Sequence, residues 1–259
     1  MAHIVSVVNQ KGGVGKSTTA VNLSSYLAHL GKFVLLVDLD PQGNASSGLG
    51  HDISETEGTY EALAGLKKAS EVIVQTGQQG LHLLAGHPNL AGSSVELVNE
   101  FSRERKLHNA LLEIRNNYDY IIIDNPPSLG LLTINGLVAA DSVLIPVQAE
   151  YYALEGLGQL MHTIDMIKES IKPELEIMGA VITMFDPRTK LSQQVLEELY
   201  KHFPAKIFRS VIPRSIRLAE APSFGKSILH YDPESKAAKA YERLAQEFLM
   251  RENPQEAII

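Results

Sequence analysis

The fold is decided by one stretch near the N-terminus, Asn9-Gln10-Lys11-Gly12-Gly13-Val14-Gly15-Lys16-Ser17-Thr18. A run rich in β-branched residues, from Ile4 to Val8, precedes it, and a helical pattern from Thr19 to Leu30 follows it. The glycines allow successive backbone N–H groups to turn inward onto one anion, and the helix that follows adds the positive end of its dipole. Strand, loop and helix in this order predict a phosphate-binding loop.

The same motif predicts roles for side chains. Lys16 is expected to reach the terminal phosphates, and the Ser17 hydroxyl is expected to bind Mg²⁺. The residues expected to contact a nucleotide through this loop are Lys11, Gly12, Gly13, Val14, Gly15, Lys16, Ser17 and Thr18. The alternative is a glycine-rich turn with two solvated lysines, but the Gly-Lys-Ser triplet between a strand and a helix favours the phosphate-binding loop.

The loop departs from the general pattern at its start. That pattern, G-x-x-x-x-G-K-[ST], has a glycine where this chain has Gln10, and a second lysine, Lys11, follows. Lys11 lies at the outer edge of the loop, so we expect its side chain to point away from its own phosphates. It is then either a solvated charge or a group that acts on a nucleotide bound by another subunit.

Length and composition limit the possible classes. A chain of 259 residues can bury a substantial core, and because no linker is visible we expect one α/β domain over residues 1–259. The absence of cysteine excludes disulfides and sites built on thiolate ligands. No leader pattern and no apolar stretch of spanning length is present, which predicts a soluble, cytoplasmic protein.

The loop variant Lys11-Gly-Gly-Val-Gly-Lys-Ser17 resembles the deviant Walker-type ATPases of the ParA/MinD superfamily, and the chain is most similar to the chromosomal ParA (Soj) branch. The resemblance extends over nearly the whole length and includes the segments Val34–Asn44, Ile121–Ser128, Phe185–Thr189 and Val211–Pro222. It implies a P-loop NTPase fold, in which helices cover both faces of a mostly parallel, twisted sheet. The missing cysteines separate the chain from the nitrogenase iron proteins, which share the loop.

Acidic residues end two of the expected strands. Asp38 and Asp40 follow the apolar run Phe33–Val37, at the strand edge where open α/β sheets bind ligands. Asp40-Pro41 also suits a turn, so a turn-capping carboxylate is the alternative. The resemblance implies that Asp40 orients the attacking water and that Asp38 lies near the metal and its water shell.

A second strand, from Tyr120 to Asp124, ends in the same way. In phosphate-loop enzymes a carboxylate on the neighbouring strand holds Mg²⁺ through water, and Asp124 is the candidate. The metal site is therefore expected at Ser17, Asp38 and Asp124. The next residue, Asn125, is a departure, because the family usually has a small residue or cysteine there.

The periodicity of the remaining sequence predicts further elements. The first strand, the first helix and the strand at Lys32–Asp38 form a βαβ unit, so the two strands should be parallel. We also expect strands near Val72–Val74, Leu81–Leu84, Ser142–Val147 and Glu176–Met184. Helices are expected at Thr59–Ala64, Ser94–Asn116, Leu154–Ser170, Leu191–Phe203 and Ser235–Met250.

By resemblance, the loops at Met184 to Asp186 and around Pro213 flank the adenine. The Asn-Lys-x-Asp pattern that reads guanine is absent. ATP is therefore favoured over GTP, and ATP and Mg²⁺ are the expected cofactors.

Positive charge is concentrated late in an acidic chain. Residues 185–226 carry eight Lys and Arg against four Asp and Glu, within a chain of net charge −7. Such a block is often only solvated surface. The positions that best match DNA contacts of the family are Arg188 and Arg217, with Arg214 as a second choice because its position also suits a contact with the nucleotide.

The resemblance implies an ATP-driven partition switch. Two ATP-bound subunits would form a sandwich dimer that binds double-stranded DNA without sequence preference, and slow hydrolysis, stimulated by a ParB-type centromere-binding protein, would release it. The catalytic residues would be Lys11, Lys16 and Asp40. Such a protein would be associated with the nucleoid, with no stable membrane association.

Two other classes remain open. One is a MinD-like membrane-cycling regulator of cell division, which needs a basic amphipathic C-terminal helix; the acidic tail Arg251–Ile259, interrupted by Pro254, disfavours it. The other is a metabolic ATP-dependent ligase or kinase, for which the sequence offers no recognisable second substrate site.

Overall fold

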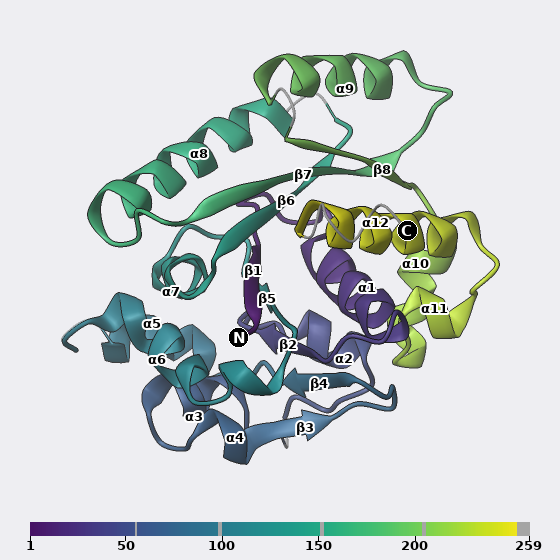
Figure 1. Cartoon of the computed structure of the whole chain (residues 1–259). Coiled ribbons are helices and arrows are strands. Elements are labelled where there is room, and N and C mark those ends of the chain that lie inside the picture. The colour runs from purple at the N-terminus through teal and green to yellow at the C-terminus, as the bar shows by residue number, and fades with distance from the viewer. Residues whose placement is uncertain (55, 98–99, 151–152, 204–205, 253–259) are drawn as a thin grey trace.

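A central β-sheet organises the chain in the computed structural model, which describes residues 1–54, 56–97, 100–150, 153–203 and 206–252. Within these residues the sheet has eight strands in the order β3-β4-β2-β5-β1-β6-β7-β8 (Figure 1). The strands are β1 (His3–Val7), β2 (Val34–Asp38), β3 (Ile73–Gln75), β4 (Leu81–Leu84), β5 (Tyr120–Asp124), β6 (Ser142–Gln148), β7 (Glu176–Phe185) and β8 (Ile207–Pro213). All neighbouring strands are parallel except β3 and β4, which confirms the predicted α/β class with a mostly parallel sheet.

Helices cover both faces of this sheet (Figure 1). On one face lie α1 (Lys16–His29), α2 (Asn44–Gly48), α11 (Ile228–Tyr231) and α12 (Lys236–Glu252), with α1 and α12 side by side. The other face is covered by α3 (Thr59–Ala64), α4 (Ala69–Val72), α5 (Leu90–Glu96), α6 (Lys106–Leu112), α7 (Leu131–Ala139), α8 (Ala153–Ser170) and α9 (Lys190–His202). The sheet therefore separates two apolar cores, as continuous buried strands such as β2 and β5 require.

The first two strands are parallel, as predicted, but they are not neighbours. β5 lies between them and pairs with both, so that Asp124 stands in register with Val7 on one side and with Asp38 on the other. Three strand ends thereby lie level at one edge of the sheet. This register brings the acids of two distant motifs next to the phosphate-binding loop.

The predicted helix from Ser94 to Asn116 is wrong. The structure has α5, a 3₁₀ turn at Arg103–Arg105, α6 and a second 3₁₀ turn at Arg115–Asn117, while residues 98–99 lie outside the described part. Ser102 has a φ of 52°, which interrupts a helix. A new helix then begins because the Asn135 side chain of α7 accepts a hydrogen bond from the Leu107 N–H at 3.1 Å. A tertiary cap, absent from the local pattern, sets this boundary.

The other predicted helices and strands are confirmed within two residues at each end, except that α1 already begins at Lys16. The sequence patterns missed α2, α4, β8, α7, α11, the short helix α10 (Ile216–Glu220) and the 3₁₀ helix η4 (Ala221–Phe224). The tail beyond Glu252, on which the argument against a membrane anchor partly rested, lies outside the described residues. Within the described part, no helix combines the length and the apolar character needed to cross a membrane.

Candidate active site

The predicted phosphate-binding loop connects β1 to α1. Gly13 and Gly15 adopt left-handed conformations with φ of 75° and 86°, which glycine accepts without strain. Gly15 precedes α1 and supplies no side-chain cap, so the first N–H groups of that helix are open to an anion. The loop is also fixed from β7, because the Thr183 hydroxyl donates a hydrogen bond to the Val14 carbonyl at 2.8 Å.

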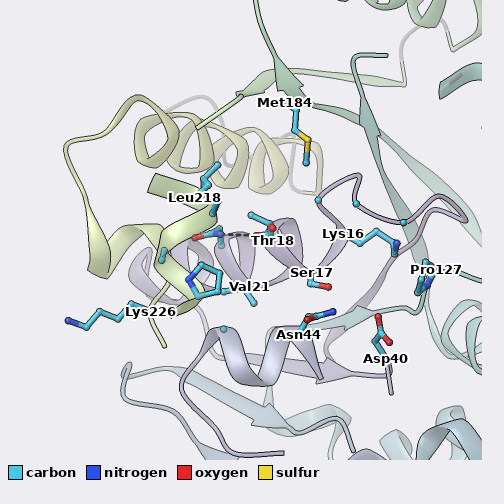
Figure 2. Close-up of a pocket in the computed structure, with 18 residues that line it drawn as sticks. Lys16, Ser17, Thr18, Val21, Asp40, Asn44, Pro127, Met184, Leu218 and Lys226 are labelled. Atoms are coloured by element: carbon cyan, nitrogen blue, oxygen red, sulfur yellow. Dashed lines mark hydrogen bonds between the residues drawn. The ribbon is translucent and has the colours of Figure 1, made fainter. Parts of the chain in front are cut away.

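A cavity of about 370 Å³ opens directly over this loop. Figure 2 shows Lys16, Asp40 and Pro127 at one end of it and Val21, Leu218 and Lys226 toward the other. Its lining includes most of the predicted loop residues, namely Gly12, Gly13, Gly15, Lys16, Ser17 and Thr18. Val14 is buried behind the loop instead.

The Lys16 ammonium group lies in a buried, acidic environment. Only 6% of the residue is exposed, and Nζ donates a hydrogen bond to the Lys11 carbonyl at 3.2 Å. Burial lowers the pKa of Lys16, whereas the negative charges of Asp124 and Asp40 oppose this shift. The side chain is thus held over the loop, where it can transfer its hydrogen bond to a phosphate oxygen.

Asp124 is a fully buried carboxylate. Neither of its oxygens has a well-oriented hydrogen-bond donor among the described residues. Burial, and next the charge of Asp38, raise the pKa of Asp124 well above its usual range, against the opposing effects of Ser17 and Lys16. Such an orphaned acid next to a hydroxyl suits a hard divalent cation with oxygen ligands. Ser17 and, through water, Asp124 are therefore the residues that would hold Mg²⁺.

Asp38 is a buried carboxylate that accepts three hydrogen bonds. Its Oδ2 accepts hydrogen bonds from the Ser46 N–H at 2.8 Å and from the Ser46 hydroxyl at 2.7 Å, and its Oδ1 accepts one from the Asp40 N–H at 3.2 Å. Burial raises the pKa of Asp38 to about 6. These bonds attach the start of α2 to the end of β2, and a place near the metal and its water shell stays a prediction for Asp38.

Asp40 forms a local turn and also lines the cavity. Its Oδ1 accepts a hydrogen bond from the Gln42 N–H at 3.0 Å, which is the local turn expected of a capping carboxylate. Its side chain also lines the cavity, in the neighbourhood of Lys16. A turn that fixes the carboxylate is compatible with orienting a water molecule.

Lys11 does not line this cavity. It faces an adjoining hollow of about 590 Å³ together with Gln10, Ser128, Leu129 and Gln159. Its ammonium group lies 3.4 Å from Glu150 Oε2, and the side chain is 37% exposed. The Lys11 side chain therefore lies outside the cavity over its own loop, and its orientation relative to bound phosphates stays a prediction.

The far end of the cavity is mainly apolar, apart from Lys226, and comes from segments distant in sequence. Val21 lies on α1, Met184 ends β7, and Leu218 and Pro222 lie on α10 and η4. Met184 has a φ of 51°, an unusual conformation for a residue with a side chain, and Figure 2 shows it at the cavity margin. These residues could enclose a planar base.

Two of the predicted base contacts, Asp186 and Pro213, stay predictions. Asp186 and Pro213 are not among the described residues that line the cavity. Asp186 instead accepts two hydrogen bonds from the Arg188 guanidinium, at 2.7 and 2.9 Å, and Pro213 ends β8 in register with Phe185. The β7 strand continues to Phe185, directly before Asp186.

The three predicted DNA contacts are exposed arginines, each with an acidic neighbour. The exposed fractions of the side chains are 87% for Arg188, 65% for Arg214 and 58% for Arg217. Arg188 pairs with Asp186, Arg214 lies 3.6 Å from Glu150, and Arg217 lies 3.1 Å from Glu220 and 3.4 Å from Asp232.

Sequence reasoning did not assign several residues of the site. Asn44 lies in the Gly43–Gly50 segment, whose glycine, serine and asparagine content was the only available signal. The apolar wall was not assigned either, because Leu218 and Pro222 carry no chemical signature of their own.

The structure has room for the unusual Asn125. This residue is buried, and its amide donates hydrogen bonds to the Ser6 hydroxyl at 2.8 Å and the Val7 carbonyl at 2.9 Å.

Comparison with known proteins agrees with this geometry. A family model described as an AAA domain matches residues 2–177. The chain is 50% identical over 255 residues to the chromosome partitioning protein ParA of Myxococcus xanthus, which covers 98% of this chain and 90% of that protein. It is also 50% identical over 247 residues to the chromosome-partitioning ATPase Soj of Thermus thermophilus, covering 95% of both.

A solved structure has the same fold. The cobyrinic acid a,c-diamide synthase of Mycobacterium smegmatis, crystallised with an ATP analogue and magnesium, aligns with a TM-score of 0.87 and 35% identity over 98% of both chains. The phosphate-binding loop, the buried Asp124 and Ser17 supply the groups that ATP and Mg²⁺ require. The chain therefore belongs to the ParA/Soj family of chromosome-partitioning ATPases, within the ParA/MinD superfamily, with ATP and Mg²⁺ as cofactors.

Proposed function

We propose that this partition ATPase works as an ATP-driven switch: two ATP-bound copies form a sandwich dimer that binds DNA without sequence preference, and hydrolysis releases it. The observation that supports this most directly is the position of Lys11. It belongs to the phosphate-binding loop, yet its side chain lies outside the cavity formed by that loop. A lysine placed in this way is available to the nucleotide of a second copy.

The proposed hydrolysis needs little covalent chemistry from the protein. Lys16 and the open N–H groups of α1 bind and orient the phosphates, and Asp40 orients the attacking water from a turn that already fixes its carboxylate. Mg²⁺, when held by Ser17 and Asp124, neutralises charge on the phosphates. Lys11 of the second copy then acts as an arginine finger does, an effect of roughly 10³ to 10⁵ in rate in related enzymes.

DNA binding is proposed for Arg188 and Arg217, with Arg214 as a further candidate. Their ion pairs with acidic neighbours are exposed, and exposed pairs of this kind contribute little, so DNA phosphates can replace the acids. Contacts with phosphates carry little sequence information and depend strongly on salt. A dimer doubles the number of contacts with one DNA molecule. Because ATP is proposed to drive dimerisation, this gives a physical reason why DNA binding should depend on ATP.

Two further parts of the proposal come from the family. A ParB-type protein bound at centromere-like DNA would stimulate hydrolysis, and the DNA-bound dimer would be associated with the nucleoid. The solved neighbour named a synthase suggests a metabolic reaction as a competing function. Chromosome partitioning is favoured because the proteins named for it are 50% identical to this chain, compared with 35% for the synthase.

The test is co-sedimentation with plasmid DNA and, separately, with anionic liposomes, each in ATP and in ADP. We expect binding to DNA in ATP alone and none to liposomes. Arg188→Ala and Arg217→Ala should weaken DNA binding several-fold and flatten its salt dependence by roughly one unit for each DNA phosphate that is no longer neutralised. Lys239→Ala, an exposed lysine outside the basic block, is the control.

The proposal has clear points of failure. Equal DNA binding in ADP and ATP would contradict the switch, and ATP-dependent liposome binding would favour the membrane-cycling alternative. Lys11→Ala should reduce turnover and dimerisation while leaving ATP binding by the monomer intact. Wild-type turnover in that variant would contradict the proposal that Lys11 acts between subunits.

A further inference from the structure

Glu150, two residues beyond the end of β6, contacts two functional segments at once. Its Oε2 lies 3.4 Å from the Lys11 ammonium group, and its Oε1 lies 3.6 Å from the Arg214 guanidinium group. The Gln148 side chain donates a hydrogen bond to the same Oε1 at 2.6 Å. One carboxylate therefore lies between the phosphate-binding loop and the end of β8.

The surroundings of Glu150 make its charge important. Lys11 and Arg214 are separated by about two hundred residues of sequence, and the two cations would repel each other without an acid between them. The carboxylate is 43% exposed and Lys11 is 37% exposed, so water screens the pair without removing it. An ion pair of this kind orients a long side chain but is easily exchanged for a stronger partner.

We propose that Glu150 is a positioning residue, which holds Lys11 on its own subunit until the triphosphate of a second copy replaces the carboxylate. This inference rests on the proposed function, because it assumes that Lys11 acts between subunits. A triphosphate with its several negative charges is a stronger partner for an ammonium group than one half-exposed carboxylate. Glu150 thereby limits dimerisation when little ATP is bound, and it keeps Lys11 close to the face where it is needed.

The first experiment measures how strongly Glu150 holds Lys11 in the nucleotide-free monomer. Glu150→Gln keeps the size of the side chain and its ability to accept the hydrogen bond from Gln148, but it removes the charge. We expect a soluble amine-acylating reagent to modify Lys11 about two- to five-fold faster in this variant, the range that follows from a half-exposed ion pair. Peptide mass spectrometry gives the rate for each lysine separately.

The second experiment measures the consequence for assembly. Light scattering at increasing ATP concentration should show that Glu150→Gln dimerises at about two- to five-fold lower ATP than wild type. Glu150→Asp, which restores the charge, should return both the acylation rate and the dimerisation midpoint toward wild-type values. Glu234→Gln is the matched control, because it removes the acid of another exposed ion pair, with Lys239 at 3.0 Å.

The outcomes separate this inference from the function on which it rests. Unchanged Lys11 acylation in Glu150→Gln would show that the carboxylate does not hold the lysine. Faster acylation with an unchanged or higher dimerisation midpoint would overturn the positioning role. Wild-type turnover in Lys11→Ala would instead contradict the proposed role of Lys11 between subunits, whatever acylation rate or dimerisation midpoint Glu150→Gln shows.

Discussion

The two ends of the nucleotide cavity are built in different ways. The phosphate end consists of a loop and strand ends that adjoin in the sheet, and each carries a recognisable local motif. The base end is assembled from α1, the end of β7, α10 and η4, which are far apart in sequence and contribute mainly apolar side chains (Figure 2). Charge and backbone geometry thus define one end, and mainly apolar packing defines the other.

The phosphate end should depend most on single charged groups. We expect Lys16→Ala to weaken ATP binding by about 10- to 100-fold, the loss typical of a hydrogen bond to a charged group. Dimerisation and DNA binding should be lost with it. Isothermal titration calorimetry with ATP measures the first effect, and light scattering the second. An intact ATP-dependent dimer in this variant would contradict the assignment of the loop.

Variants of Asp40 test whether ATP binding and ATP hydrolysis depend on different groups at the phosphate end. Asp40→Ala should retain ATP and accumulate as a long-lived dimer, with turnover reduced by about 10²-fold or more, as expected when a group that orients water is removed. Single-turnover kinetics and light scattering measure the two effects.

Asp40→Asn serves as the comparison for the turn. It keeps an oxygen for the hydrogen bond from Gln42 and should therefore preserve the local structure. If Asp40→Ala lowers stability but leaves turnover near normal, the carboxylate is only a turn cap.

The base end should instead depend on close backbone packing. Gly225, next to η4, has a φ of 60°, and a Cβ there would lie 2.6 Å from the Cα of Gly50. Gly65 has a similar φ of 72° but open space around it. We expect Gly225→Ala to reduce the free energy of unfolding by about 2–4 kcal/mol, from backbone strain plus overpacking, and Gly65→Ala by only about 1 kcal/mol.

Urea unfolding measures both glycine variants, and ATP titration shows whether the base end is disturbed. Gly225→Ala should also weaken ATP binding, because Pro222 and Lys226 lie on the same segment. Equal destabilisation of the two variants would mean that the close approach of Gly50 and Gly225 has no energetic importance.

The buried acids at the phosphate end predict that the free energy of unfolding depends on pH. Burial raises the pKa of Asp38 to about 6 from a usual value of 3.8. Between these values the folded chain keeps a proton that the unfolded chain has released, so the free energy of unfolding should fall as pH rises through this window, by up to about 3 kcal/mol. Asp38→Asn should show a flatter profile.

This dependence is measured by urea unfolding between about pH 4.5 and about pH 7, without nucleotide or Mg²⁺. Adding Mg²⁺ and ATP should restore stability at the upper end, because the ligands bind only the folded chain and neutralise the acidic cluster. An identical slope for wild type and Asp38→Asn would assign the effect to another acid, with Asp124 as the next candidate.

Local sequence was sufficient for the phosphate end of this protein. The glycines at 13 and 15, with Lys16 and Ser17, are required by the conformation and charge of the loop itself, so their roles follow from their spacing. Asp124 was a candidate from sequence because it ends an apolar strand, as the carboxylate that holds Mg²⁺ does in phosphate-loop enzymes. A few adjacent residues therefore determine the chemistry of the phosphate-binding loop.

Tertiary structure decided what depends on partners from elsewhere in the chain. The hydrogen bonds of Asp38 come from Ser46, eight positions later, which the local pattern did not indicate. The start of α6 is set by Asn135, and the place of β5 between β1 and β2 is set by packing of the whole sheet. These partners lie eight to more than a hundred positions apart, and only the folded chain brings them together.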